Sequence, residues 1–242
     1  MAGKGSLSLD IIQAIILGIV QGATEFLPVS SSGHLVLTPW WLGWPVPPDL
    51  VFSVAAHLGT LCAVLLYFRD DWKRIMRGGV HLLRTRSRQD PDGRLFVLLV
   101  IGSVPIGVFG TLFARQVEAA FQQPVEAAAL LLVTALLLIF SERKTATTQE
   151  RRTADQMTWQ DALFVGLAQM LAIFPGVSRS GSTIAAGLYR GVDRIDAARF
   201  SFLLGAPTIL GAGLLAGLEM LRYGDLASQL PLLLAGFAGA AV

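Results

Sequence analysis

Carboxyl, hydroxyl, imidazole and guanidinium groups are concentrated in two short segments of this chain. In the first segment, residues 21–34, the carboxylate of Glu25 is followed within ten residues by Ser31 and His34. A hydroxyl with an imidazole and an acid nearby is a typical composition for nucleophilic catalysis. The second segment contains Arg179, whose planar guanidinium matches phosphate oxygens through two parallel hydrogen bonds. These residue types predict phosphoryl chemistry, with Glu25, Ser31, His34 and Arg179 as the catalytic candidates.

Each segment also contains a proline that ends a helix, Pro28 in the first and Pro175 in the second. The helix that restarts after each break has unpaired N–H groups carrying about half a positive charge, and such ends bind anions. Serine and threonine hydroxyls gather at both restarts in larger number than helix capping needs. We therefore expect them to bind substrate oxygens. The predicted substrate-binding residues are Gln21, Ser30, Ser32, Ser178, Ser180 and Thr183.

Gln21 and Glu25 are four residues apart and share one face of the first helix. An ionisable side chain inside an apolar segment is costly, so Glu25 is expected to be functional, either orienting His34 or binding a metal ion. His57 lies in an apolar stretch without comparable neighbours in the sequence. We interpret it as hydrogen-bonded within a helix bundle and leave it out of the catalytic set.

The two segments belong to an internal repeat. A shift of 148 residues aligns Gln21 with Gln169 and Ser30 with Ser178, and the match continues through about 45 residues without a gap. Three full spans are expected between the two broken helices, which gives the repeats opposite orientations in a membrane. The prediction is one membrane domain, 1–242, with repeat one at about 8–115 (re-entrant helix–loop–helix 11–42) and repeat two at about 158–242 (re-entrant 162–189).

Composition points to a bilayer. The chain is 53% hydrophobic and 15% charged, whereas about 25% of residues are charged in a soluble domain. Uncharged stretches at 50–68, 95–114 and 200–218 are about as long as the ~20 residues that cross the hydrocarbon core. A shorter stretch covers 127–141, and 226–242 stops at the last residue, so we expect a further span to be missing. The sequence thus predicts an all-α integral membrane protein with about five or six transmembrane helices.

Positive charge is uneven along the chain. Seven of the 19 lysines and arginines fall between Lys73 and Arg94, and four more fall in 143–152. Basic loops stay in the cytoplasm, so the first re-entrant loop is expected to open to the outer, periplasmic face. The net charge of +2 comes with no nucleic-acid recognition motif, and nucleic acid is not an expected partner.

With these residues in view, the chain resembles the bacterial undecaprenyl-diphosphate phosphatase family, the bacitracin-resistance proteins. The family's first motif is Glu or Gln, three residues, then Glu, and it is met by Gln21 and Glu25; its second, Pro-Gly-x-Ser-Arg-Ser-x-x-Thr, is met by 175–183. The resemblance covers nearly the whole chain. Gln21 replaces a glutamate that many members carry, which bears on metal binding at that position.

The resemblance implies hydrolysis of undecaprenyl diphosphate to undecaprenyl phosphate and inorganic phosphate. This reaction would recycle the lipid carrier for peptidoglycan synthesis in the bacterial inner membrane and confer bacitracin resistance. It also implies a divalent cation, Mg²⁺ or Ca²⁺. The expected partners are a polyprenyl diphosphate lipid and the bilayer, and the sequence leaves a homodimer open.

Several alternatives remain open at this point. An inverted repeat of broken helices is also the plan of secondary transporters, so a flippase for the lipid carrier is the competing function. A serine intramembrane protease fits less well, because it has no use for Arg179. For the nucleophile we favour Ser31 with His34 as its base; His34 itself and a metal-activated water are the other candidates.

Overall fold

The computed structural model describes residues 9–44, 48–86, 90–147, 151–223 and 226–242. Within these ranges every regular element is a helix, apart from an isolated bridge between Arg152 and Val192. The elements in chain order are α1 (Ile11–Glu25), α2 (Ser31–Trp41), α3 (Leu50–Tyr67), α4 (Arg69–Thr85), α5 (Pro91–Leu112), α6 (Ala114–Ala120), α7 (Pro124–Thr147), the short 3₁₀ turn η1 (Ala154–Gln156), α8 (Trp159–Leu171), α9 (Arg179–Tyr189), α10 (Arg194–Tyr223) and α11 (Leu226–Ala241).

Four described helices are long and apolar enough to cross a membrane: α3, α5, α7 and α10. They cover the four predicted stretches at 50–68, 95–114, 127–141 and 200–218. The helices α1 and α11 are apolar but shorter, so the stretch 226–242 forms a helix below spanning length. The predicted all-α integral membrane fold is confirmed.

Helix starts follow the local sequence. Asp10 caps α1 by accepting a hydrogen bond from the N–H of Gln13, and Gln13 bonds back to the N–H of Asp10. Thr158 and Asp161 form the same reciprocal box at the start of α8. The two boxes lie 148 residues apart, as do the starts of α2 and α9. The repeat found in the sequence therefore coincides with the starts of these helices.

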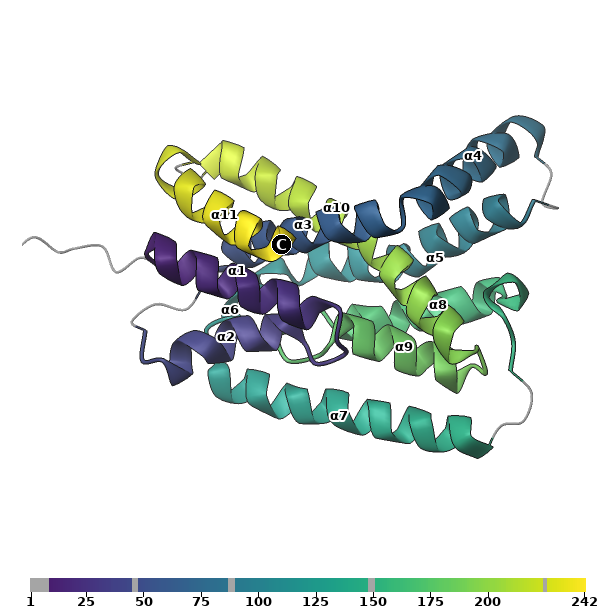
Figure 1. Ribbon diagram of the computed structural model, residues 1–242, viewed down its shortest axis with the longest axis horizontal. Helices are drawn as coiled ribbons and strands as arrows, with labels where there is room; N and C mark the ends of the chain where they lie inside the picture. The colour runs from purple at the N-terminus through teal and green to yellow at the C-terminus, as the bar shows by residue number, and fades with distance from the viewer. Residues whose placement is uncertain (1–8, 45–47, 87–89, 148–150, 224–225) are drawn as a thin grey trace, which may run out of the picture.

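The two helical hairpins, α1–α2 and α8–α9, enter from opposite ends of the molecule, and their loops face each other near its middle (Figure 1). Helix α7 runs alongside both hairpins and packs against α2 and α9. The ends of α4 and α7 and the starts of α5, α8 and α10 lie at one end of the long axis. These helix ends carry the basic loops, so the molecule has one basic end, opposite the end where α1 enters.

Each hairpin packs against a helix of the other repeat. Helix α1 packs on α11, and α8 packs on α5. A Cβ atom added at Gly18 would lie 2.4 Å from the carbonyl oxygen of Gly236, and one at Gly166 would lie 2.4 Å from that of Gly102. Gly18 and Gly166 are equivalent in the repeat. Their missing side chains let the helix backbones approach closely, which is the usual way helices pack in a membrane.

Candidate active site

Glu25 is the centre of the predicted site. It is the last residue of α1, and 5% of it is exposed. Its Oε2 accepts hydrogen bonds from Gln21 Nε2 at 2.8 Å and from Ser31 Oγ at 2.5 Å, and its Oε1 accepts one from Arg179 Nη2 at 2.6 Å. Arg179 comes from the second repeat, 154 residues further along the chain. The ion pair thus joins the two hairpins at their loops, and both charges are compensated inside the protein.

The loops after α1 and α8 present equivalent serines. Ser30 caps α2 and Ser178 caps α9, each accepting a hydrogen bond from the glycine N–H three residues later. The Oγ atoms of Ser30 and Ser32 are 3.3 Å apart, and so are those of Ser178 and Ser180. Two helix N-termini with serine hydroxyls therefore occupy equivalent places in the two repeats, and helix ends of this kind favour anions.

Helix α7 anchors the second loop. Thr134 Oγ1 donates to the carbonyl oxygen of Gly176 at 3.0 Å and accepts from the N–H of Ser178 at 2.9 Å. Gly176 has φ of +99°, and a Cβ atom there would lie 2.2 Å from the carbonyl oxygen of Ala127 on α7. A side chain at Gly176 would therefore meet both an unfavourable backbone conformation and the backbone of α7.

These loops form one side of a cavity of about 150 Å³. Its polar wall holds Glu25, Ser30, Ser31, Ser32, Ser53, His57, Ser178, Arg179 and Ser180. The rest of the lining is largely apolar, from Leu50, Val54, Ile106, Val117, Phe121, Ala172, Ile173, Val177, Ile209 and Ala212 with Thr208. Arg179 Nε is buried and has no hydrogen-bond partner among the described residues, so one donor of the guanidinium remains for a ligand. The cavity thus suits an amphiphile with an anionic head.

Seven of the ten predicted residues line this cavity: Glu25, Ser30, Ser31, Ser32, Ser178, Arg179 and Ser180. Gln21, His34 and Thr183 do not. Gln21 is fully buried and reaches the site through its hydrogen bond to Glu25. Thr183 Oγ1 lies 2.6 Å from Ser201 Oγ and also donates to the backbone of α9, which ties α9 to α10.

The predicted pairing of Ser31 with His34 is not among the hydrogen bonds of the described residues. His34 Nδ1 lies 2.8 Å from the carbonyl oxygen of Ser30, one helical turn back. Ser31 donates instead to Glu25. The spacing of three residues does place Ser31 and His34 on the same side of α2. The hydrogen bond to the carbonyl oxygen of Ser30, however, orients the imidazole ring of His34 toward the backbone and not toward the Ser31 hydroxyl. In this geometry the hydrogen-bond acceptor of the Ser31 hydroxyl is Glu25.

Sequence reasoning missed His57. Its Nε2 lies 3.5 Å from Glu25 Oε2, its Nδ1 lies 2.7 Å from the carbonyl oxygen of Ser53, and its side chain lines the cavity. The sequence did hold an indication of this role. The stretch 50–68 contains no Asp, Glu, Lys or Arg, and His57 is its single histidine. Ionisable groups at such depth are functional candidates by default. Its proximity to Glu25 depends on the packing of α3 against α1.

The oxygen donors for a divalent cation are limited. Glu25 is the single carboxylate lining the cavity, and the described residues contain no group of three or more His, Cys, Asp or Glu able to hold a metal ion. Mg²⁺ often binds through one or two carboxylates plus substrate phosphates. The protein donors present are therefore too few for a metal held by protein groups alone, and a cation at Glu25 would need diphosphate oxygens as its further ligands.

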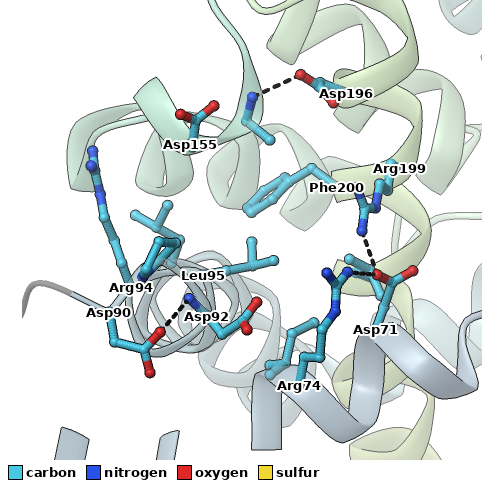
Figure 2. Close-up of a pocket in the computed structure, with 15 residues that line it drawn as sticks. Asp71, Arg74, Asp90, Asp92, Arg94, Leu95, Asp155, Asp196, Arg199 and Phe200 are labelled. Atoms are coloured by element: carbon cyan, nitrogen blue, oxygen red, sulfur yellow. Dashed lines mark hydrogen bonds and ion pairs between the residues drawn. The ribbon is translucent and has the colours of Figure 1, made fainter. Parts of the chain in front are cut away.

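A larger cavity, of about 460 Å³, lies at the basic end (Figure 2). Its lining mixes acidic and basic side chains, and Asp71 accepts hydrogen bonds from both Arg74 and Arg199, which ties α4 to α10. None of the predicted site residues lines it. Its lining contains five aspartates and three arginines, an excess of negative charge that does not favour an anion, whereas the serine-rich helix starts of the two hairpins border the smaller cavity.

The fold and the smaller cavity define a class: a helical membrane protein with a hydroxyl-rich cavity, lined by one arginine and one carboxylate, between two hairpins that enter from opposite ends. The family model described as "Bacitracin resistance protein BacA" matches residues 14–242. An undecaprenyl-diphosphatase of Moorella thermoacetica is 45% identical over 207 residues, covering 86% of this chain and 76% of that protein. One of Thermomicrobium roseum is 45% identical over 242 residues, covering 97% and 86%, and one of Desulforudis audaxviator is 47% identical over 208 residues, covering 86% and 76%. This chain belongs to the BacA family of bacitracin resistance proteins.

Proposed function

We propose that this protein hydrolyses undecaprenyl diphosphate to undecaprenyl phosphate and inorganic phosphate. The observation that carries the proposal is the meeting of Glu25, Ser31 and Arg179 in one cavity that is polar at the loops and apolar beyond them. The relatives that share most of the chain are undecaprenyl-diphosphatases. A membrane site of this shape lets the lipid tail stay among apolar side chains while the diphosphate reaches the loops.

The geometry favours Ser31 as the nucleophile. Its Oγ attacks the terminal phosphorus while its proton passes to Glu25 Oε2, 2.5 Å away. The bond between the terminal phosphorus and the bridging oxygen breaks, and undecaprenyl phosphate leaves with the electron pair. Water then cleaves the phosphoserine and releases inorganic phosphate. Glu25 takes the role of base that the residue spacing predicted for His34.

Arg179 and the two helix N-termini bind the phosphate oxygens. The guanidinium already lies against Glu25, so a diphosphate entering the cavity meets a cation that is fixed before it arrives. Preorganised donors of this kind stabilise the charge that develops in the transition state. A cation bound with the diphosphate, Mg²⁺ or Ca²⁺, would be held by Glu25 and would neutralise phosphate charge.

The proposed location is the bacterial plasma membrane, with the basic end in the cytoplasm. The first hairpin enters from the opposite end (Figure 1), which supports access for the lipid from the outer face. In that position the enzyme would return the carrier lipid to peptidoglycan synthesis.

The test is phosphate release from undecaprenyl diphosphate by the purified protein in detergent, with and without a chelator. A phosphatase releases phosphate there, whereas a transporter has no gradient to use and leaves the lipid intact. Single-turnover reaction with terminally labelled lipid, followed by acid quench, identifies the nucleophile. Phosphoserine survives acid, phosphohistidine survives base, and direct attack by water leaves no labelled protein.

A further inference from the structure

Ser53, on α3, brings a hydroxyl group to the active-site cavity. The residue is 2% exposed and lines the cavity. Its backbone N–H donates to the carbonyl oxygen of Asp49, and its own carbonyl oxygen lies 2.7 Å from His57 Nδ1. Its Oγ, in contrast, has no hydrogen-bond partner among the residues that the structure describes. Buried hydroxyl groups are nearly always bonded to protein, water or a ligand, because leaving one unpaired is costly.

Hydroxyl groups on the long apolar helices can bond within their own helix. Ser103 donates to the carbonyl oxygen of Leu99 at 2.7 Å, and Thr208 donates to carbonyl oxygens of α10. The carbonyl oxygen of Asp49, one turn before Ser53, could accept in the same way, but the Ser53 hydroxyl does not bond to it. The hydroxyl is therefore available to a ligand in the cavity.

The second repeat shows a different use of the equivalent hydroxyl. The shift of 148 residues aligns Ser53 with Ser201 and Leu35 with Thr183. Ser201 Oγ lies 2.6 Å from Thr183 Oγ1, a bond that joins α10 to α9. In the first repeat the position of Thr183 is taken by Leu35, which is fully buried and has no hydroxyl to offer. One repeat thus uses its serine to hold two helices together, and the other leaves the equivalent serine at the cavity.

The ligand that suits this hydroxyl is one that accepts hydrogen bonds. Arg179 Nε, a second donor without a partner among the described residues, belongs to a side chain that lines the same cavity. The neighbours of Ser53 on α3 that line the cavity, Leu50 and Val54, have apolar side chains. The oxygens of an ionised diphosphate accept hydrogen bonds, and a bond from a hydroxyl to an ionised acceptor is stronger than one to a neutral group. The two donors therefore fit one anionic head group.

We propose that Ser53 is a substrate-binding residue, whose hydroxyl donates a hydrogen bond to a phosphate oxygen of the lipid diphosphate. The identity of this ligand rests on the phosphatase function given above. The proposal assigns to α3 a contact with the head group, in addition to the contacts from the two hairpins. Because the bond is present both in the bound substrate and in the transition state, its loss weakens binding more than it slows the chemical step.

The experiment compares Ser53→Ala with Ser201→Ala, the same substitution at equivalent positions. Two quantities are measured for each purified variant: the Kd of a lipid diphosphate analogue whose bridging oxygen is replaced by a methylene group, and the unfolding transition without ligand. We expect Ser53→Ala to raise Kd about tenfold, as the loss of one hydrogen bond to a charged group does, and to unfold as the wild type does.

Ser201→Ala should unfold more easily than the wild type, because its hydroxyl joins α10 to α9. In phosphate release, Ser53→Ala should raise KM by a factor similar to that for Kd, while kcat changes by less than about threefold. Ser103→Ala, on α5 and outside the cavity lining, is the control for binding.

Two results would overturn the proposal. The first is a Ser53→Ala variant that binds the analogue within about twofold of the wild-type Kd. The second is a Ser53→Ala variant that unfolds more easily than the wild type or does not fold, which would show that the hydroxyl serves the fold. The binding measurement does not depend on turnover. A wild-type protein that binds the analogue but releases no phosphate would therefore defeat the phosphatase function alone, so the two failures are distinguishable.

Discussion

In the first hairpin Ser31 occupies the place that Arg179 occupies in the second, and Glu25 has Ile173 as its counterpart. The first hairpin brings the acid and the hydroxyl and connects them to each other, through Gln21, Glu25 and Ser31. The second brings the cation, and its loop is fixed from outside by Thr134 on α7. The two repeats thus share helix starts capped by a serine, and they differ in the side chains at equivalent positions of the loops.

The hairpins also differ in how their loops are turned. Ser30 itself has φ of +63°, a left-handed conformation that is uncommon for residues with a side chain, whereas in the second loop the positive φ falls on Gly176. Backbone strain of this kind collects at functional sites and is held there by the surrounding packing. The loop before Ser31 is therefore the strained one, and the loop before Arg179 is the relaxed one.

Ser31→Ala tests whether the first hairpin supplies the nucleophile. If the first hairpin supplies the nucleophile, phosphate release should fall about a thousandfold, since loss of a covalent nucleophile costs orders of magnitude. The matched control is Ser103→Ala on α5, where the hydroxyl only bonds the carbonyl of Leu99. A Ser31→Ala variant retaining more than about a tenth of the activity would rule out the serine mechanism.

A substitution at Asp161 tests how much the start of α8, the first helix of the second hairpin, contributes to stability. Asp161 is fully buried at the start of α8 and pairs with Arg152 at 2.8 Å and Arg190 at 2.7 Å. Its counterpart in the first hairpin is Gln13, which is neutral. Asp161→Asn should cost about 3 kcal/mol of unfolding free energy, at the low end for buried pairs because both arginines reach solvent. Chemical unfolding in detergent measures it, with exposed Asp155→Asn as the control.

The pH dependence of this contribution has a definite sign. Burial raises the pKa of Asp161, but hydrogen bonds from Arg152, Thr158 and Arg190 outweigh it, so the folded pKa lies below the usual range for aspartate. A depressed folded pKa gives stability that is present above the unfolded pKa and is lost only as the pH falls through the folded one. The difference between wild type and Asp161→Asn should therefore stay constant from about pH 5 to 8. A difference that shrinks within that window would contradict the assignment.

Arg179→Lys tests the contribution of the second hairpin to catalysis. Lysine keeps the charge but loses the planar fork, and we expect phosphate release to fall on the order of tenfold or more. Arg115→Lys on the exposed part of α6 is the control. Near-normal turnover by Arg179→Lys would mean that the arginine only pairs with Glu25 and that the second hairpin has no part in binding phosphate.

The sequence predicted the helix breaks, the four long spans and seven of the residues that line the cavity, because proline breaks, uncharged stretches and a duplicated motif are local signals. The rest depends on contacts between distant segments. The ring of His34 turns back on Ser30, Thr183 bonds Ser201 on α10, and His57 reaches Glu25 only because α3 packs against α1. Spacing along a single helix gives none of these, since each is decided by which helix lies alongside.

Gln13→Ala tests the start of α1, the first helix of the first hairpin. Gln13→Ala removes the reciprocal bond of the capping box, yet Asp10 still accepts from the N–H of residue 13, because that bond uses the backbone. The lost hydrogen bond is exposed, so unfolding free energy should fall by only about 0.5 kcal/mol. The equivalent change in the second hairpin, Asp161→Asn, removes a charge that two arginines surround. If the two substitutions lower the unfolding free energy by the same amount, the starts of α1 and α8 contribute equally to stability despite their different side chains. The asymmetry between the hairpins is then confined to the loops at the cavity.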